Sequence, residues 1–408
     1  MRMRTAAAAW RLAWQAALAL TLVGVPAFAG VLPEDRADAM YHRYDGGGIT
    51  IEGPSILVRK KIGDKFSVAA NYYEDLISSA SLDVQLSASK YEETRKQKSL
   101  SFDYLHGKST YSAGVINSVE LDYKSNTAFY SVSQDMFGDL TTLSMSFKRG
   151  WDRVYKDVKV DGVLVNAPDF GGVDANGDPV AFRPADHRGY ALALSQILTR
   201  NLLMSLNYEV LTDQGFLASP YRQIRYASAG GKGFTLADQI YPNTRTSNAA
   251  SIQLKYYLPW RAALTGQYRF FTDTWGIVGH TAQIGYTHPA WKHWIFDGSL
   301  RYHRQTAADF YSDLFPRANS QNFMARDREL AQFQSYGIGL GASYEFSVPR
   351  LRWINKSTAN VSVTHLMIDY DNFRNALLTD PANGINAGSE PLYKLNANVI
   401  QVYLSIWF

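Results

Sequence analysis

The chain ends in Val399-Ile400-Gln401-Val402-Tyr403-Leu404-Ser405-Ile406-Trp407-Phe408, where every second residue is apolar. The apolar set is Ile400, Val402, Leu404, Ile406 and Phe408. Successive side chains of a β-strand point to opposite faces, so a period of two predicts a strand with one apolar face. The ends of soluble chains are normally polar and poorly ordered. A terminal strand of this kind therefore indicates a sheet whose apolar face is covered.

The first 29 residues have the three parts of a secretory signal peptide. Arg2 and Arg4 give a basic start, residues 12–25 are mostly apolar, and Ala27-Phe28-Ala29 is a small-x-small cleavage site. The apolar part is short for a membrane-spanning helix. We therefore predict export, with residues 1–29 removed and residues 30–408 forming one mature domain.

Composition narrows the class of exported protein. The chain contains no cysteine, which excludes disulfides, cysteine metal sites and a thiol nucleophile. The mean hydropathy is −0.23, and no run of about 18 apolar residues follows residue 29, so no helical span is predicted. Aromatic residues nevertheless reach 13%. These properties fit an outer-membrane β-barrel, because alternation hides its hydrophobicity from the average.

The alternation of the last strand recurs along the whole chain. Long gaps follow strands three, seven, nine, thirteen and fifteen, whereas links as short as Thr199-Arg200 follow even-numbered strands. Bacterial barrels keep their termini and short turns in the periplasm and their long loops outside. We predict sixteen strands, near residues 37–46, 49–59, 65–74, 98–106, 110–121, 125–135, 141–151, 187–198, 201–210, 246–257, 261–271, 276–287, 292–304, 333–346, 356–370 and 394–408.

The predicted fold is therefore all-β: a transmembrane antiparallel β-barrel of about 16 strands, with long extracellular loops and short periplasmic turns. Its predicted location is the outer membrane of a Gram-negative bacterium. A β-sandwich with one wet face would share the alternation, but the signal peptide and the terminal Phe408 favour the barrel.

Two details of the barrel are also predicted. In the strand near 356–370 the apolar residues change face after Val363, which indicates a bulge near His365. The Ser- and Ala-rich segment 77–89 is a candidate for a loop inserted into the lumen, with a surface loop as the alternative. The segment 215–222 is a second candidate insert, with Tyr221 as its anchor.

Four stretches spread over the mature chain form a recognisable set. They are Ser118-Val119-Glu120-Leu121-Asp122-Tyr123-Lys124-Ser125, Gly215-Phe216-Leu217-Ala218-Ser219-Pro220-Tyr221-Arg222, Tyr268-Arg269-Phe270-Phe271-Thr272-Asp273-Thr274-Trp275-Gly276-Ile277, and Arg301-Tyr302-His303-Arg304-Gln305 with Ala307-Ala308-Asp309-Phe310-Tyr311. Together they resemble an uncharacterised bacterial family of outer-membrane barrels, domain of unknown function 3570 (DUF3570). The resemblance implies the barrel fold and the outer-membrane location, and it implies no activity.

The main candidate site consists of charged residues on the expected inner face. We expect Arg269, Asp273, Arg301 and Asp309 to gather where strands meet the outer loops, as ion pairs that hold the loops inward. The functional alternative is an anion-steering ladder made of Arg269, Arg301 and Lys255.

A second candidate is a group of carboxylates, Glu120, Asp122 and Asp103, expected on neighbouring inner faces. Such a group binds a cation or shares a proton. The ordinary expectation is pairing with nearby basic residues, Lys124, Lys148 or Arg149. The Asp- and Gly-rich segment 169–178 lacks the spaced ligands and terminal Glu of an EF-hand loop. We therefore predict no metal site and no cofactor.

Three functions remain open. The first is a porin-like channel or conduit for a small polar solute. The second is a loop-plugged barrel that serves as a scaffold or docking partner for periplasmic or surface proteins, redox proteins among them. The remote third is an outer-membrane hydrolase using histidines of the cluster His280, His288, His293 and His303. The chain has no Gly-x-Ser-x-Gly elbow and no His-Glu-x-x-His motif, so we predict no catalytic residues and no enzyme activity.

The expected partners follow from the predicted barrel. They are the lipid bilayer, a periplasmic protein, and the barrel-assembly machinery, which would recognise Phe408, Ile406 and Leu404 of the terminal strand. The net charge is +4, and blocks of like charge are limited to Arg59-Lys60-Lys61. Nucleic acid is therefore not an expected partner.

Overall fold

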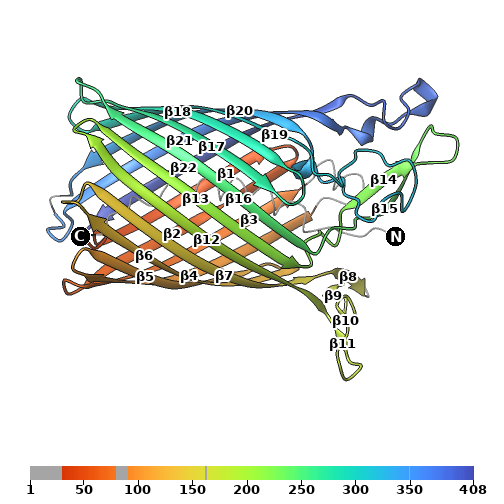
Figure 1. Ribbon diagram of the computed structural model, residues 1–408, viewed down its shortest axis with the longest axis horizontal. Helices are drawn as coiled ribbons and strands as arrows, with labels where there is room; N and C mark the ends of the chain where they lie inside the picture. Colours follow the sequence, from red (N-terminus) through yellow and green to blue (C-terminus); the bar gives the residue numbers. More distant parts are fainter. Residues whose placement is uncertain (1–29, 80–90, 161–162, 349) are drawn as a thin grey trace.

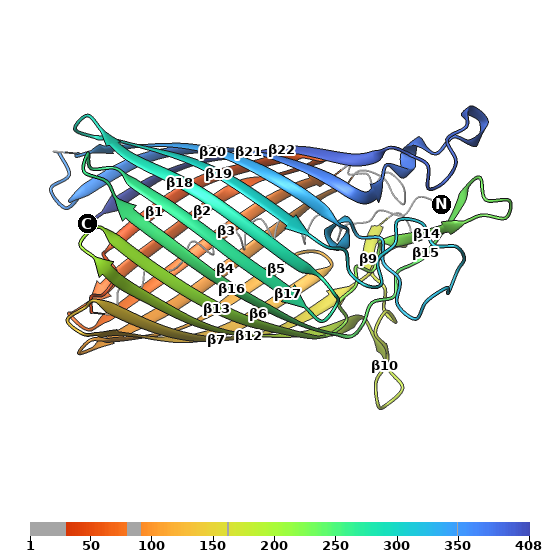
Figure 2. The same ribbon diagram turned by 45° about the horizontal axis from the view of Figure 1, so that its top comes forward.

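The computed structural model describes residues 30–79, 91–160, 163–348 and 350–408. The long strands of this part form one closed antiparallel barrel, in which β1 pairs with β22 to complete the ring (Figures 1 and 2). The barrel has sixteen strands in the described part, which confirms the number predicted from the alternation. The predicted signal peptide, residues 1–29, lies outside the described residues.

The barrel strands are 11 to 19 residues long. A tilted strand of about 9–11 residues is enough to cross a bilayer. The barrel strands are β1 (Arg36–Gly46), β2 (Ile49–Ile62), β3 (Phe66–Ser79), β4 (Tyr91–His106), β5 (Ser109–Val119), β6 (Tyr123–Met136), β7 (Thr141–Tyr155), β12 (Phe182–Thr199), β13 (Leu202–Gly215), β16 (Thr244–Tyr257), β17 (Ala263–Asp273), β18 (Val278–Ala290), β19 (Trp294–Gln305), β20 (Phe333–Phe346), β21 (Lys356–Arg374) and β22 (Leu392–Trp407).

Smaller elements lie in the long connections. Three two-stranded sheets pair β8 (Asp157–Val160) with β9 (Val163–Asn166), β10 (Gly172–Val173) with β11 (Pro179–Val180), and β14 (Gln223–Ala227) with β15 (Phe234–Asp238). The 3-10 helices are η1 (Arg328–Leu330), η2 (Ala376–Leu378) and η3 (Pro381–Asn383). Helices of the described part are too short or too polar to cross a membrane.

The two ends of the barrel differ in their connections. Short turns and the C-terminus lie at one end, and the long connections, with β8–β11, β14 and β15, lie at the other (Figures 1 and 2). This asymmetry is the predicted one, and it assigns the long-loop end to the cell exterior. Most of the candidate insert 77–89 lies outside the described residues.

The outer face of the barrel is apolar. Leu340 on β20 and Ile284 on β18 are 67% and 59% exposed. Other outward apolar residues include Ile56, Leu100, Val115, Met145, Leu192, Leu254, Leu300, Ile338 and Val402. Closed barrels leave no strand edge unpaired in hydrocarbon, and an apolar outer band of this extent requires lipid. The protein is therefore an outer-membrane β-barrel.

Strand β21 does not contain the bulge predicted near His365. Its register with β20 is unbroken from Ser357 to Tyr370, and its register with β22 shifts only between Asp369 and Arg374. The inner face turns apolar because Leu366 and Ile368 join a buried cluster with Tyr370, Phe373, Leu395, Ala397 and the loop residue Ala331. The sequence pattern changes because the inner face meets an apolar neighbour there, while the strand itself stays regular.

The terminal strand β22 lies between β1 and β21 at the closure of the barrel. Leu404 and Ile406 are opposite Ala39 and Ala37 of β1. The backbone N–H of Phe408 donates a hydrogen bond to the carbonyl oxygen of Asp35 at 3.3 Å. The strand whose alternation predicted the fold thus completes the barrel.

Candidate functional site

One part of the lumen wall is basic. Arg269 on β17, Arg301 on β19 and Lys255 on β16 alternate with outward residues such as Leu254 and Leu300, so they share the inner face. Arg301 and Lys255 have no acidic partner within 4 Å among the described residues, and Arg269 reaches only the Glu209 carboxylate at 3.9 Å. The structure therefore places the three cations of the predicted ladder on one inner face, with Arg269 alone beside an acid among the described residues.

A belt of amides continues this wall. Gln253, Gln267 and Gln283 are directly opposite one another on β16, β17 and β18, and Gln283 is opposite Arg301 on β19. Amide side chains offer both hydrogen-bond donors and acceptors. The wall of β16–β19 can therefore replace water around a polar solute, whether or not the solute carries a charge.

The predicted acidic partners, Asp273 and Asp309, have different contacts. Asp273 pairs with Arg245, Oδ2 to Nη2 2.5 Å, and accepts the backbone N–H groups of Trp275 and Ile277 at 3.0 and 2.9 Å. The backbone N–H of Asp309 donates to the carbonyl oxygen of Trp275 at 2.8 Å. The Asp273 carboxylate and the Asp309 backbone thus stabilise the turn between β17 and β18, and neither acid forms an ion pair with Arg269 or Arg301 among the described residues.

Carboxylates on the wall of β3–β7 are held by neighbours. Asp75 accepts hydrogen bonds from Arg95 at 2.5 Å and contacts His42 at 2.6 Å. Asp103 accepts a hydrogen bond from the Ser112 hydroxyl at 2.6 Å. On this wall Asp75 is paired with a cation, whereas Asp103 has a neutral hydroxyl as its partner among the described residues.

The loop connections 216–243 and 306–332 pack together at the extracellular end, and we call them the loop cap. Arg222 pairs with Asp327 and Glu329, at 2.9 and 2.5 Å. Arg225, which is 0% exposed, pairs with Asp313 and with Glu390 of the β21–β22 connection. A buried apolar cluster joins these pairs, and it includes Leu217, Tyr241, Trp275, Ile277, Ala308, Phe310, Ala325 and Leu330.

The loop cap also contacts the rim at separated places. The Tyr221 hydroxyl accepts a hydrogen bond from the backbone N–H of Asp157, at the start of β8, at 2.8 Å. On another side, Tyr44 of β1 packs against the buried cluster that contains Ala331 of the cap. These contacts join connections that are not neighbours around the ring, so the cap narrows the extracellular mouth.

A group of buried carboxylates lies beside the contact made by Tyr221. Glu93, near the start of β4, meets Glu120 and Asp122 of the β5–β6 connection, and ligand oxygens of the three lie within 4.8 Å of one another. Asp103, which the sequence analysis placed in this group, lies elsewhere with Ser112. Burial, followed by the charges of Glu93 and Asp157, raises the pKa of Asp122 well above its ordinary value. Glu93 was not predicted as a member of this group, although it precedes the predicted strand near 98–106 and has the same inward alternation.

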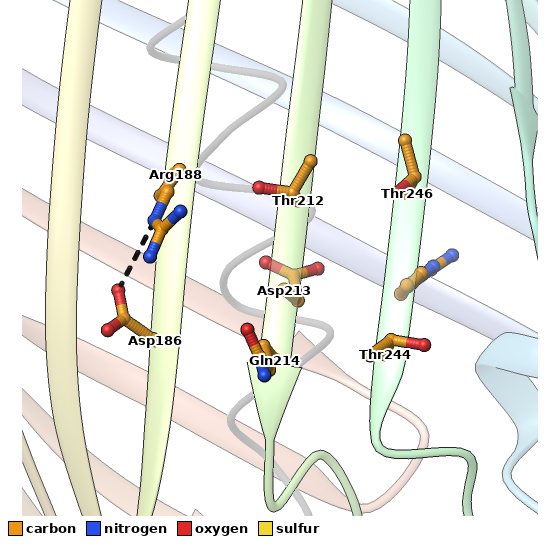
Figure 3. Close-up of a pocket in the computed structure, with 8 residues that line it drawn as sticks. Asp186, Arg188, Thr212, Asp213, Gln214, Thr244 and Thr246 are labelled. Atoms are coloured by element: carbon orange, nitrogen blue, oxygen red, sulfur yellow. Dashed lines mark ion pairs between the residues drawn. The ribbon is translucent and has the colours of Figure 1, made fainter.

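A small polar depression lies on the outer face, across β12, β13 and β16 (Figure 3). Its volume is about 130 Å³. Asp186 and Arg188 form its ion pair at 3.9 Å, and they share the outer face with the exposed Tyr190. Ligand pockets are typically about 300–1,000 Å³, so this depression belongs to the membrane-facing rim and adds nothing to the lumen.

The histidines of the hydrolase alternative do not form one site in the described part. His303 faces inward and contacts the Thr281 hydroxyl at 2.9 Å. His280 and His288 contact the outward-facing tyrosines Tyr268 and Tyr286 at 2.6 and 3.2 Å. A catalytic triad needs its three groups within hydrogen-bond reach, and this arrangement does not supply one.

Residues 86–369 match a family described as "Protein of unknown function (DUF3570)". The chain belongs to the DUF3570 family. The match includes all four stretches that carried the resemblance, and it covers the basic wall, the loop cap and the buried carboxylates. No curated protein matches this DUF3570 chain.

Solved structures similar to this DUF3570 barrel include a bacterial polysaccharide outer membrane secretin, with a TM-score of 0.47, 7% identity, and coverage of 92% of this chain and 100% of the secretin. The outer membrane protein opdK from Pseudomonas aeruginosa has a TM-score of 0.41 and 9% identity over 91% of this chain and 99% of opdK. The siderophore receptor PirA from Acinetobacter baumannii has a TM-score of 0.43 and 10% identity over 83% of this chain and 53% of PirA, so this chain spans about half of that receptor. At these levels of identity, none of the three indicates what the DUF3570 barrel binds.

Proposed function

We propose that this DUF3570 barrel is a conduit for small polar solutes across the outer membrane, with a preference for anions, and that the loop cap restricts its extracellular mouth. The observation that carries the proposal is the basic wall of Arg269, Arg301 and Lys255, in which Arg301 and Lys255 have no acidic partner among the described residues and Arg269 has only Glu209 at 3.9 Å. Fixed charges along a pore attract ions of opposite sign and repel ions of like sign. The amide belt of Gln253, Gln267 and Gln283 supplies exchangeable hydrogen bonds for uncharged solutes.

Ion selectivity in planar bilayers tests this proposal. The purified barrel should show ion-conducting steps with a higher permeability to chloride than to potassium. The double variant Arg269→Gln/Arg301→Gln should lower that ratio severalfold, because both cations are removed from the basic wall. Arg304→Gln is the matched control, since Arg304 lies on the same strand as Arg301 but opposite the outward His280. An equal loss of selectivity in the control would contradict the assignment of the basic wall.

The loop cap favours a second candidate, a plugged barrel that acts as a docking scaffold. Its buried ion pairs and apolar cluster resemble a folded unit more than a set of loose loops. The two candidates differ in the conductance of a variant with a weakened cap, such as Arg222→Ala. Correct insertion without conductance, in both the wild type and this variant, would favour the scaffold over the conduit.

A further inference from the structure

The carboxylate group beside the loop cap is almost completely buried. Glu93, Glu120 and Asp122 are 8%, 4% and 1% exposed. The Tyr221 hydroxyl lies close to Asp122, but neither carboxylate oxygen of Asp122 accepts a hydrogen bond of good geometry among the described residues, and Oδ2 of the adjacent Asp157 has no partner there either. No basic side chain forms an ion pair with Asp122 or Glu93 in that part of the chain. A buried carboxylate without a partner is costly, so these orphaned oxygens point to a missing cation.

The spacing of the carboxylates suits a hard divalent cation. Calcium takes six to eight oxygen ligands at about 2.3–2.6 Å, so two ligands of one ion lie at most about 5.2 Å apart. The oxygens of Glu93, Glu120 and Asp122 lie within 4.8 Å of one another. With both oxygens of each carboxylate, these three residues can supply most of the coordination shell of calcium.

The position of the group connects it to the loop cap. Asp157 follows β7 and donates its backbone N–H to the Tyr221 hydroxyl at 2.8 Å. Burial, followed by the charges of Asp122 and Asp157, raises the pKa of the Tyr221 phenol, so Tyr221 stays neutral and remains close to the acids. The start of β4 and the connections after β5 and β7 lie at the same end of the barrel as β14 and β15 (Figure 1).

We propose that Glu93, Glu120 and Asp122 bind a calcium ion at the extracellular end of the DUF3570 barrel, and that this ion anchors the loop cap through Asp157 and Tyr221. A bound ion fixes the β5–β6 connection against β4 and neutralises the acids that Tyr221 packs against. Loss of the ion leaves like charges in contact and loosens the Tyr221 anchor. The site does not depend on the conduit proposal, because its ligands come from β4 and the β5–β6 connection, whereas the basic wall lies on β16–β19.

Calcium titration of the full-length barrel in detergent micelles, after treatment with a chelator, tests the site by calorimetry. The wild type should bind one calcium ion per chain, with a Kd in the range of about 10⁻⁴–10⁻³ M or tighter, as in extracellular calcium modules. Asp122→Asn should weaken binding at least tenfold, because it removes an orphaned ligand. Asp174→Asn is the matched control: Asp174 is a loop carboxylate that already accepts the backbone N–H groups of Asn176 and Asp178 at 2.8 and 3.0 Å.

A second measurement separates a calcium site from a shared proton. Calcium should slow proteolysis of the loop cap in the wild type and have no effect on Asp122→Asn. If Asp122→Asn does not fold, Glu93→Gln takes its place, because it changes a ligand at the end of a strand. Two results together would overturn the proposal in favour of protonated carboxyls. These are no saturable calcium binding by the wild type, and a loop cap that resists proteolysis better in Asp122→Asn than in the wild type without calcium. Magnesium binding as tight as that of calcium would overturn the choice of calcium.

Discussion

Arg222 and Glu329, 107 residues apart in the chain, form a buried two-point ion pair, with Nη1–Oε2 at 2.5 Å and Nη2–Oε1 at 3.1 Å. The pair joins the β13–β16 connection to the β19–β20 connection. Two parallel hydrogen bonds between a guanidinium and a carboxylate fix both distance and orientation. Because Tyr221 is the adjacent residue, this pair also sets the position of the contact with Asp157.

Replacement of Arg222 by alanine should open the loop cap while the barrel stays folded. The remaining contact of Glu329 with Nε of Arg328 is 3.8 Å, too long for a hydrogen bond. Loss of one partner of a buried pair costs about 3–5 kcal/mol. We expect faster proteolysis within residues 216–243 and a larger single-channel conductance. Arg149→Ala is the control: it breaks the exposed pair with Asp186 and should change neither property. Unchanged proteolysis in Arg222→Ala would show that the apolar cluster alone holds the cap.

Acid should loosen the loop cap through Glu329. Burial alone would raise the pKa of Glu329, but Arg222 and the nearby Arg328 hold it at about 2, below the ordinary value of 4.5. Because the folded-state pKa is lowered, the stabilisation is complete above pH 4.5 and is lost as the pH falls toward 2. Hydrogen exchange in residues 306–332, corrected for intrinsic rates, should increase across that window. Glu329→Gln should abolish this pH dependence, and an identical profile in both proteins would assign the transition to another group.

An arginine should be tolerated inside the barrel and rejected outside it at adjacent positions of β18. Ile284 faces outward and Gln283 faces the lumen, near the middle of the same strand. Ile284→Arg should destabilise the barrel by about 2–4 kcal/mol, as expected for arginine at the bilayer midplane. Gln283→Arg should cost much less and should increase anion selectivity. Unfolding by urea in lipid vesicles measures both, and equal losses for the two variants would contradict the assigned faces.

Deletion of Phe408 should reduce assembly of the barrel in cells more than refolding in vitro. Phe408 contacts Trp353, with ring centroids 6.0 Å apart, at the short-turn end. We expect less folded barrel in the outer membrane because the terminal strand is proposed to be recognised during assembly. Phe346→Ala is the control, since Phe346 is an aromatic residue near the same end that ends β20. Similar membrane levels of the deletion and the control would argue against recognition of Phe408.

The periodicity of the sequence predicted the strands and their connections because alternation is a local property. Each strand crosses lipid with one face, so its own residues record which face that is. The pattern misled at β21, where Leu366 and Ile368 are apolar on the inner face. A strand cannot indicate whether an apolar face meets lipid or a folded loop, and the expected bulge near His365 arose from that ambiguity.

The composition of the candidate site depended on contacts between distant residues. Arg269, Arg301 and Lys255 could be placed on one inner face from alternation, but Asp273 could equally have paired with Arg269 or with Arg245. The register of β16 against β17 decides between those partners. Glu93 joined Glu120 and Asp122 because β4 pairs with β5 along a register that the spacing of residues does not reveal.

The sequence by itself determined a closed, lipid-embedded barrel with its long loops on one side. Strand periodicity and connection length are local properties, so both can be read directly from the order of residues. Only the tertiary structure decided that loops 216–243 and 306–332 fold into a cap, because Arg222 and Glu329 meet across 107 residues. The same packing buried Asp122 beside Glu93 and Glu120. Burial and charge compensation are properties of the assembled fold, and no local pattern encodes them.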